Sequence, residues 1–184
     1  GYGFLYYLSY SVLTYPFALL AGDEGILAAG RLLSSVLESA TIVLVCMIAK
    51  RVGAPAWLTI LLGVAMAFTP GLMVIHKPLS AEQFSNFLIV AAAFGALTMP
   101  LSSFRNNLFL VSVLAGAAIS IKLNAALQGV FFAIIVLFRL YKERGDLFLS
   151  TERVAKKGKA VAVDIGVMIA GLATFFVWNL PILT

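Results

Sequence analysis

The sequence predicts an all-α protein, a polytopic bundle of transmembrane helices, and three observations support this fold class. The chain of 184 residues is 62% hydrophobic and 11% charged, with a mean hydropathy of +1.04. Its apolar residues fall into runs, and about 20 such residues let a helix cross about 30 Å of hydrocarbon. Its Lys and Arg residues gather between alternate runs, as in cytoplasmic loops. These features exclude a soluble enzyme, a nucleic-acid binder and a disordered tail, because a soluble fold could not cover so much apolar surface.

The first segment, residues 1–22, carries no charge but holds five of the chain's six tyrosines. Tyrosine favours the membrane–water interface, because its ring prefers hydrocarbon and its hydroxyl prefers water. Asp23 and Glu24 follow immediately. We therefore expect residues 1–22 to form a juxtamembrane helix on the outer surface, with a complete first span as the alternative. No methionine or leader precedes Gly1, so we expect a piece of a longer polypeptide.

Charged residues divide the remaining chain into about six apolar spans, each interpreted as a transmembrane helix. They cover residues 32–49, 52–75, 83–104, 106–121, 123–138 and 165–184. Between the last two lies a basic loop, residues 139–164, expected to be cytoplasmic. This loop either rests in part on anionic headgroups or serves only to set the topology. Residues 1–184 together form one transmembrane helical domain.

The 13 Lys and Arg residues orient the bundle. Arg31, Lys77 and Lys122 fall on one side, and the other ten share the side of Lys50 and Arg51. Because cytoplasmic loops carry the excess of cations, the Lys50 side is predicted to be cytoplasmic. The net charge of +5 belongs to these loops, so no nucleic-acid partner is expected. The protein is expected to be a multi-pass integral protein of a plasma, inner or endoplasmic reticulum membrane.

Ionisable groups at membrane depth are costly and usually functional. Glu38 interrupts the span 32–49 and shares a helix face with Arg31, seven residues earlier. It is either a functional carboxylate or a polar contact that holds helices together. Cys46 is the one cysteine and lies in an apolar run, which excludes a disulfide framework and indicates a small apolar residue.

The outer loop at residues 75–82 gathers three groups that could carry chemistry: His76, Lys77 and Glu82. A carboxylate facing a cleft could act as a general base or hold a divalent cation such as Mg²⁺ or Mn²⁺. The alternative is an ordinary solvated loop.

Lys122 ends a short span rich in small residues. Residues 106–121 would extend only about 24 Å as a helix, less than the bilayer, so Lys122 is expected to lie below the outer surface. A lysine placed there could bind a phosphate as a point charge, or it could simply snorkel to the interface. Trp57 and Trp178 are interpreted as interfacial anchors. The sequence has no Gly-rich phosphate loop, His-x-x-x-His pair or Gly-x-Ser-x-Gly elbow, so triad hydrolases and multi-histidine metal enzymes are not expected.

Taken in order, several segments resemble the membrane glycosyltransferases of the GT-C fold, in the branch of protein O-mannosyltransferases and aminoarabinose transferases. These segments are FLYYL at 4–8, LLAG at 19–22, AGRLLS at 29–34, IAKRVG at 48–53, Thr69-Pro70, Glu82-Gln83-Phe84 and AGAAISIK at 115–122. The resemblance covers nearly the whole chain and implies a GT-C-like bundle. Enzymes of that family transfer a sugar from a polyprenyl-phosphate donor on the outer or lumenal side.

Carried over by position, the resemblance makes Glu82 the acidic residue of the second outer loop and the candidate catalytic group. Lys122 would contact the donor phosphate, and Arg31 would lie near it. The family commonly has aspartate where this chain has Glu82. Its main catalytic carboxylate lies upstream of Gly1, and Asp23 and Glu24 fall too late to replace it.

Two other functions remain open. A secondary transporter would use Glu38, Glu82 and Lys122 as a coupling network, although no internal repeat is visible. A non-catalytic subunit would instead assemble with partners in a membrane-protein complex.

Overall fold

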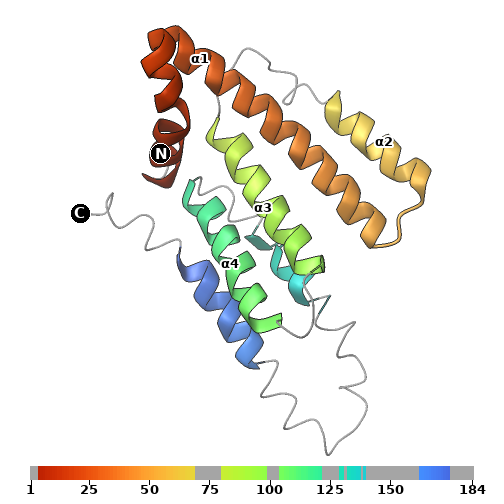
Figure 1. Cartoon of the computed structure of the whole chain (residues 1–184). Helices are drawn as coiled ribbons and strands as arrows, with labels where there is room; N and C mark the ends of the chain where they lie inside the picture. Colours follow the sequence, from red (N-terminus) through yellow and green to blue (C-terminus); the bar gives the residue numbers. More distant parts are fainter. Residues whose placement is uncertain are drawn as a thin grey trace, which may run out of the picture.

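The computed structural model describes residues 4–68, 80–98, 104–121, 129–130, 132–137, 139 and 162–174. Within these ranges all regular structure is helical and no strand occurs, which confirms the all-α prediction there. The principal helices are α1 (Phe4–Arg51), α2 (Ala56–Ala67), α3 (Ala81–Thr98) and α4 (Phe104–Ile121). A further helix spans Ala162–Thr174 and is drawn in dark blue in Figure 1.

Helix α1 is sharply bent near its first third (Figure 1). The bend lies at Ala21 (φ −141°, ψ 19°) and Gly22 (φ 58°, ψ −142°). The Gly22 backbone lies in a region that is open almost only to glycine. The bend divides α1 into a short arm, residues 4–20, and a long arm, residues 23–51. It falls where the sequence predicted the first segment to end.

Helix α2 turns back along the long arm after the turn at 52–55, in which Gly53 has a φ of 96° (Figure 1). The two helices touch where Cys46 meets α2. Its Sγ lies 3.6 Å from the carbonyl oxygen of Thr59, and a Cβ built on Gly63 would lie 3.0 Å from that sulfur. None of residues 56–67 is buried, so α2 covers the long arm on one side and presents its own apolar surface outward.

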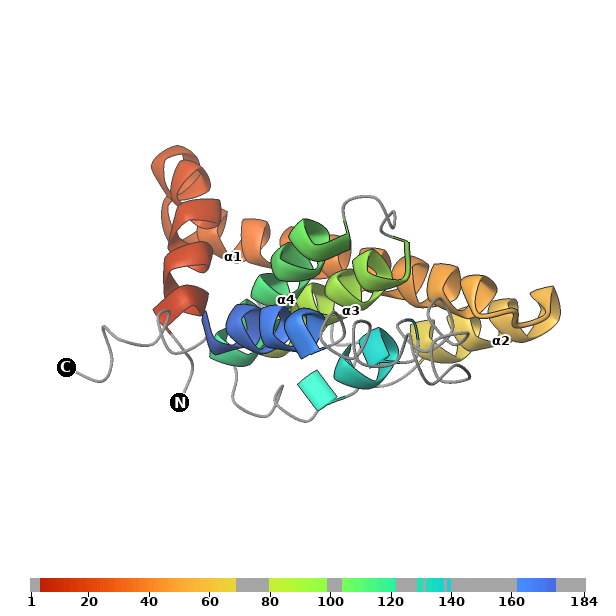
Figure 2. The same ribbon diagram turned by 90° about the horizontal axis from the view of Figure 1, so that it is seen from below.

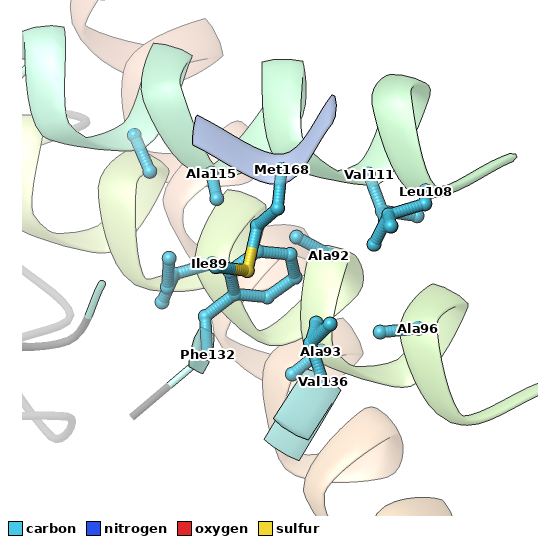
Figure 3. Close-up of a cluster of buried hydrophobic side chains, with 11 residues drawn as sticks. Ile89, Ala92, Ala93, Ala96, Leu108, Val111, Ala115, Phe132, Val136 and Met168 are labelled. Carbon is cyan, nitrogen blue, oxygen red and sulfur yellow. The ribbon is translucent and has the colours of Figure 1, made fainter. Parts of the chain in front are cut away.

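Helices α3 and α4 pack antiparallel and form the core with small side chains (Figure 3). Ala92, Ala93 and Ala96 of α3 are almost fully buried. A Cβ built on Gly95 would lie 2.7 Å from Cγ1 of Val111, so α4 approaches closely there. The rest of the core cluster comprises Ile89, Leu108, Val111, Ala115, Ala118, Phe132, Val136 and Met168. Small residues allow such close contact between helices.

The helix 162–174 crosses α4 through glycines on both helices. A Cβ built on Gly171 would lie 2.4 Å from Cβ of Ser112, and one on Gly116 would lie 2.9 Å from the Leu172 carbonyl oxygen. The sequence contains no pair of glycines four residues apart, but Ser112 and Gly116 form an equivalent pair of small residues. Side chains larger than these would force the two helices apart.

Within the described ranges, one helix, Leu5–Arg51, is long and apolar enough to cross a membrane. Only 17% of its most apolar 18-residue window is buried inside the structure, so most of that window is exposed. Three shorter apolar helices are present at Ala56–Ala67, Asn107–Ile121 and Ala162–Thr174. The long apolar helix supports membrane association.

Candidate functional site

The first turn of α3 lies against the middle of the long arm of α1, and an amide–carboxylate hydrogen bond joins them. Nε2 of Gln83 donates to Oε1 of Glu38. Both side chains are half-buried. A hydrogen bond to a charged acceptor is stronger than one between neutral groups, so this contact fixes the start of α3 on α1.

A capping box sets the orientation of Gln83. The backbone N of Ser80 donates to Oε1 of Gln83 at 3.0 Å, and the backbone N of Gln83 donates to Oγ of Ser80 at 3.3 Å. Two otherwise unpaired backbone N–H groups at the helix start are thereby satisfied. Because Oε1 of Gln83 accepts from Ser80, its Nε2 is turned toward Glu38.

Glu82 lies one residue earlier, in the same first turn of α3, and its side chain is exposed. Negative charge is favoured near a helix N-terminus, where backbone N–H groups point outward. Glu82 and Glu38 are therefore carried on adjacent helices, one exposed and the other held by Gln83. This is the pair of predicted site carboxylates that the structure brings to the same region.

Arg31 lies on the long arm, two turns before Glu38, and its side chain is exposed. Its carbonyl oxygen accepts from Oγ of Ser35 at 3.1 Å. The hydrogen bond recorded for the Glu38 carboxylate joins it to Gln83 rather than to Arg31. Three other predicted site residues, His76, Lys77 and Lys122, lie outside the described residues.

Sequence reasoning missed Gln83 as a site residue. The signal was the spacing Ser80-x-x-Gln83 before an apolar run, which is a capping-box pattern. This pattern could have predicted that α3 begins at Ala81 and that the Gln83 amide lies in the first turn of the helix. The partner on α1 could not have been predicted in this way, because the pattern is local and Glu38 lies on another helix.

Two further charged residues are buried away from this turn. Arg139 donates from Nη1 to the carbonyl oxygen of Ala96, near the end of α3. Asp164 is fully buried in the first part of the helix 162–174. They are the first and last residues of the expected basic loop 139–164, of which residues 140–161 lie outside the described ranges. Residues 162–164 of that expected loop instead begin a helix.

Among the residues that the structure describes, no group of three or more His, Cys, Asp or Glu side chains gathers as a metal site would require. No protein-family model, curated protein or solved structure matches the chain.

Proposed function

We propose that the chain belongs to the transmembrane module of a GT-C-like glycosyltransferase, which uses a polyprenyl-phosphate sugar on the extracytoplasmic or lumenal side. The main support for the proposal comes from the first turn of α3. Glu82 is exposed at the first turn of α3, and its neighbour Gln83 is anchored to Glu38. Glu38 lies near the middle of the long arm, between the bend at Gly22 and the predicted cytoplasmic end at Lys50 and Arg51.

The proposed chemistry requires a carboxylate and cationic groups. In the proposed reaction, Glu82 takes the proton from an acceptor hydroxyl. The hydroxyl oxygen then attacks the anomeric carbon of the sugar, and the bond from that carbon to the lipid phosphate breaks. Lys122 and Arg31 stabilise the negative charge left on the phosphate. His76 and Lys77 help to bind the donor in the same outer loop.

The proposal includes a multi-pass arrangement in the membrane. The long arm of α1 would cross the bilayer, and α3, α4 and the helix 162–174 would pack beside it. The Glu38–Gln83 contact would then hold the first turn of α3 at a fixed height on the long arm. A fixed height matters because a general base must come within hydrogen-bond reach of the proton it removes.

The test is a transfer assay with the full-length protein reconstituted in liposomes, using radiolabelled polyprenyl-phosphate mannose as the first donor. We expect Glu82→Gln and Lys122→Ala each to lower the rate at least about tenfold. Glu24→Gln is the matched control, because Glu24 is also exposed but lies at the bend of α1. Full activity in both site variants would refute the assignment.

A secondary transporter is the second candidate, and Glu38 is the observation that favours it. A carboxylate within a long apolar helix, held by an amide, is typical of proton or ion coupling in membrane proteins. Solute flux into vesicles that depends on a proton or sodium gradient, and that is lost in Glu38→Gln, would support transport. Transfer activity without flux would favour the enzyme.

A further inference from the structure

A buried serine joins the first part of α3 to the last turn of α4. Oγ of Ser85 donates to the carbonyl oxygen of Ala118 at 3.0 Å, and both residues are almost fully buried. The carbonyl groups in the last turn of a helix are the ones most open to side-chain donors. Ser85 therefore holds α4 close to Ile121, its last residue.

Much of the remaining contact between α3 and α4 is made by small apolar side chains. Ala92 and Ala96 of α3 and Ala115 of α4 are fully buried there (Figure 3). Such side chains let helices pack closely, but they offer few projections that would stop one helix from sliding along the other. A hydrogen bond is directional, so it fixes the register of the two helices. Ser85 provides this fixed point at the end of α3 that carries Glu82.

The same part of α3 is also joined to α1. Gln83 donates to Glu38 on the long arm. Gln83 and Ser85 are two residues apart, which is about 200° around a helix, so they bind α1 and α4 on opposite sides of α3. The start of α3 is thus held between two helices by two hydrogen bonds.

Glu82 lies on the face of α3 between these two contacts. Around the helix it is about 100° from Gln83 and about 60° from Ser85. Ile89 and Ala93 share the face of Glu82 and are buried in the core (Figure 3). Glu82 itself is exposed, although it continues the same face. Its carboxylate therefore lies where the buried face ends, one turn before Ser85.

The direction of α4 relates this end of α3 to the phosphate-binding residue of the proposed reaction. Helices α3 and α4 lie side by side and antiparallel, so α4 ends beside the start of α3 (Figure 1 and Figure 2). Lys122 follows Ile121 in the chain and comes four residues after Ala118, while Glu82 comes three residues before Ser85. Each proposed group is thus about one helical turn along the chain from the same hydrogen bond.

We propose that Ser85 is a positioning residue for the sugar transfer. Its hydrogen bond to Ala118 sets the separation between the carboxylate of Glu82 and the end of α4 that leads to Lys122. The base must reach the acceptor proton while the cation neutralises the leaving phosphate, and a displacement of about 1 Å can lower a rate about a hundredfold. Ser85 itself takes no part in making or breaking bonds. The inference rests on the proposed function.

The test compares Ser85→Ala with Ser112→Ala in the reconstituted transfer assay. Both changes remove a buried serine hydroxyl from the interior of the bundle, but among the described residues Oγ of Ser112 has no hydrogen-bond partner. We expect Ser85→Ala to lower kcat at least about fivefold with little change in the KM for the lipid donor, because the donor-binding groups remain. Ser112→Ala should keep the wild-type kcat. Equal kcat values in the two variants would overturn the proposal.

A double variant separates positioning from a general loss of folded protein. Ser85→Ala is combined with Glu82→Gln, which removes the base that Ser85 is proposed to position. We expect the additional loss to be smaller than about twofold, because the position of the base no longer matters once the base is absent. A loss as large as in the wild-type background would show that Ser85 affects folding alone, and the proposal would then be wrong.

Hydrogen exchange measures the contact without any activity. Exchange at residues 118–121 should be faster in Ser85→Ala than in the wild-type protein and unchanged in Ser112→Ala, because only Ser85 is bonded to the end of α4. Unchanged exchange in Ser85→Ala would overturn the role of the hydrogen bond. A wild-type protein without transfer activity would instead overturn the proposed function, and the catalytic role of Ser85 with it, whatever the exchange rates are.

Discussion

The amide of Gln83 on α3 donates to the carboxylate of Glu38 on α1 while its own oxygen accepts from the backbone of Ser80. One side chain thus both caps a helix and docks it on another. The exposed Glu82 is adjacent in the chain, so its position depends on the same contact.

The Glu38–Gln83 contact should be sensitive to charge. Gln83→Glu keeps a side chain that can form the capping box but replaces the amide donor with a second carboxylate facing Glu38. We expect it to lower the free energy of unfolding by about 1–3 kcal/mol, because a half-buried acceptor loses its donor and gains a like charge. The measurement is thermal or denaturant unfolding of the purified protein in detergent.

The exchanged pair provides the control for that change. Glu38→Gln combined with Gln83→Glu restores one amide and one carboxylate across the same interface. Recovery of most of the lost stability is expected, since residues in contact couple in a double-mutant cycle. If the double variant lost as much unfolding free energy as the two single variants together, the two residues would not interact.

Ser80 should contribute to the start of α3. Ser80→Ala removes the hydroxyl that accepts from the Gln83 backbone, and loss of such a cap costs about 1 kcal/mol. Hydrogen exchange at residues 81–84 should accelerate. Ser39→Ala is the control, because Ser39 is exposed on the long arm. Equal exchange rates in the two variants would argue against the cap.

The crossing of α4 and the helix 162–174 should not tolerate added volume. Gly171→Ala sets a methyl group against Cβ of Ser112, so we expect destabilisation of about 1–3 kcal/mol. Gly166→Ala lies in the same helix with open space around it and should be neutral or slightly stabilising. The measurement compares the unfolding midpoints of the Gly171→Ala and Gly166→Ala variants in the same detergent. Equal midpoints would mean that the helices cross elsewhere.

Several parts of the fold follow from local sequence. The uncharged tyrosine segment ends at Gly22, and the bend in α1 occurs there because that backbone conformation needs glycine. Helix α3 begins at Ala81, two residues before the expected span, because Ser80 and Gln83 cap it. Helix α2 occupies only Ala56–Ala67 of the expected span 52–75, of which residues 69–75 lie outside the described ranges.

Contacts between distant segments could not be predicted in this way. Sequence spacing places Arg31 and Glu38 on one face of α1, but it contains no information about which other helix meets that face. In the structure, Gln83 of α3 is the residue that contacts Glu38. The close approach of Gly171 to Ser112 likewise joins residues far apart in the chain. Periodicity identifies which residues share a helix, whereas the partner depends on how the helices pack.

The central claim is that the carboxylate of Glu82 acts on the sugar acceptor, and the most direct measurement compares three variants in the reconstituted transfer assay. Glu82→Gln removes the base, Glu82→Asp keeps a carboxylate, and Glu24→Gln removes an exposed carboxylate at the bend. The account predicts a loss of at least about tenfold in Glu82→Gln, substantial activity in Glu82→Asp and full activity in Glu24→Gln. Equal activity in Glu82→Gln and Glu24→Gln would contradict it.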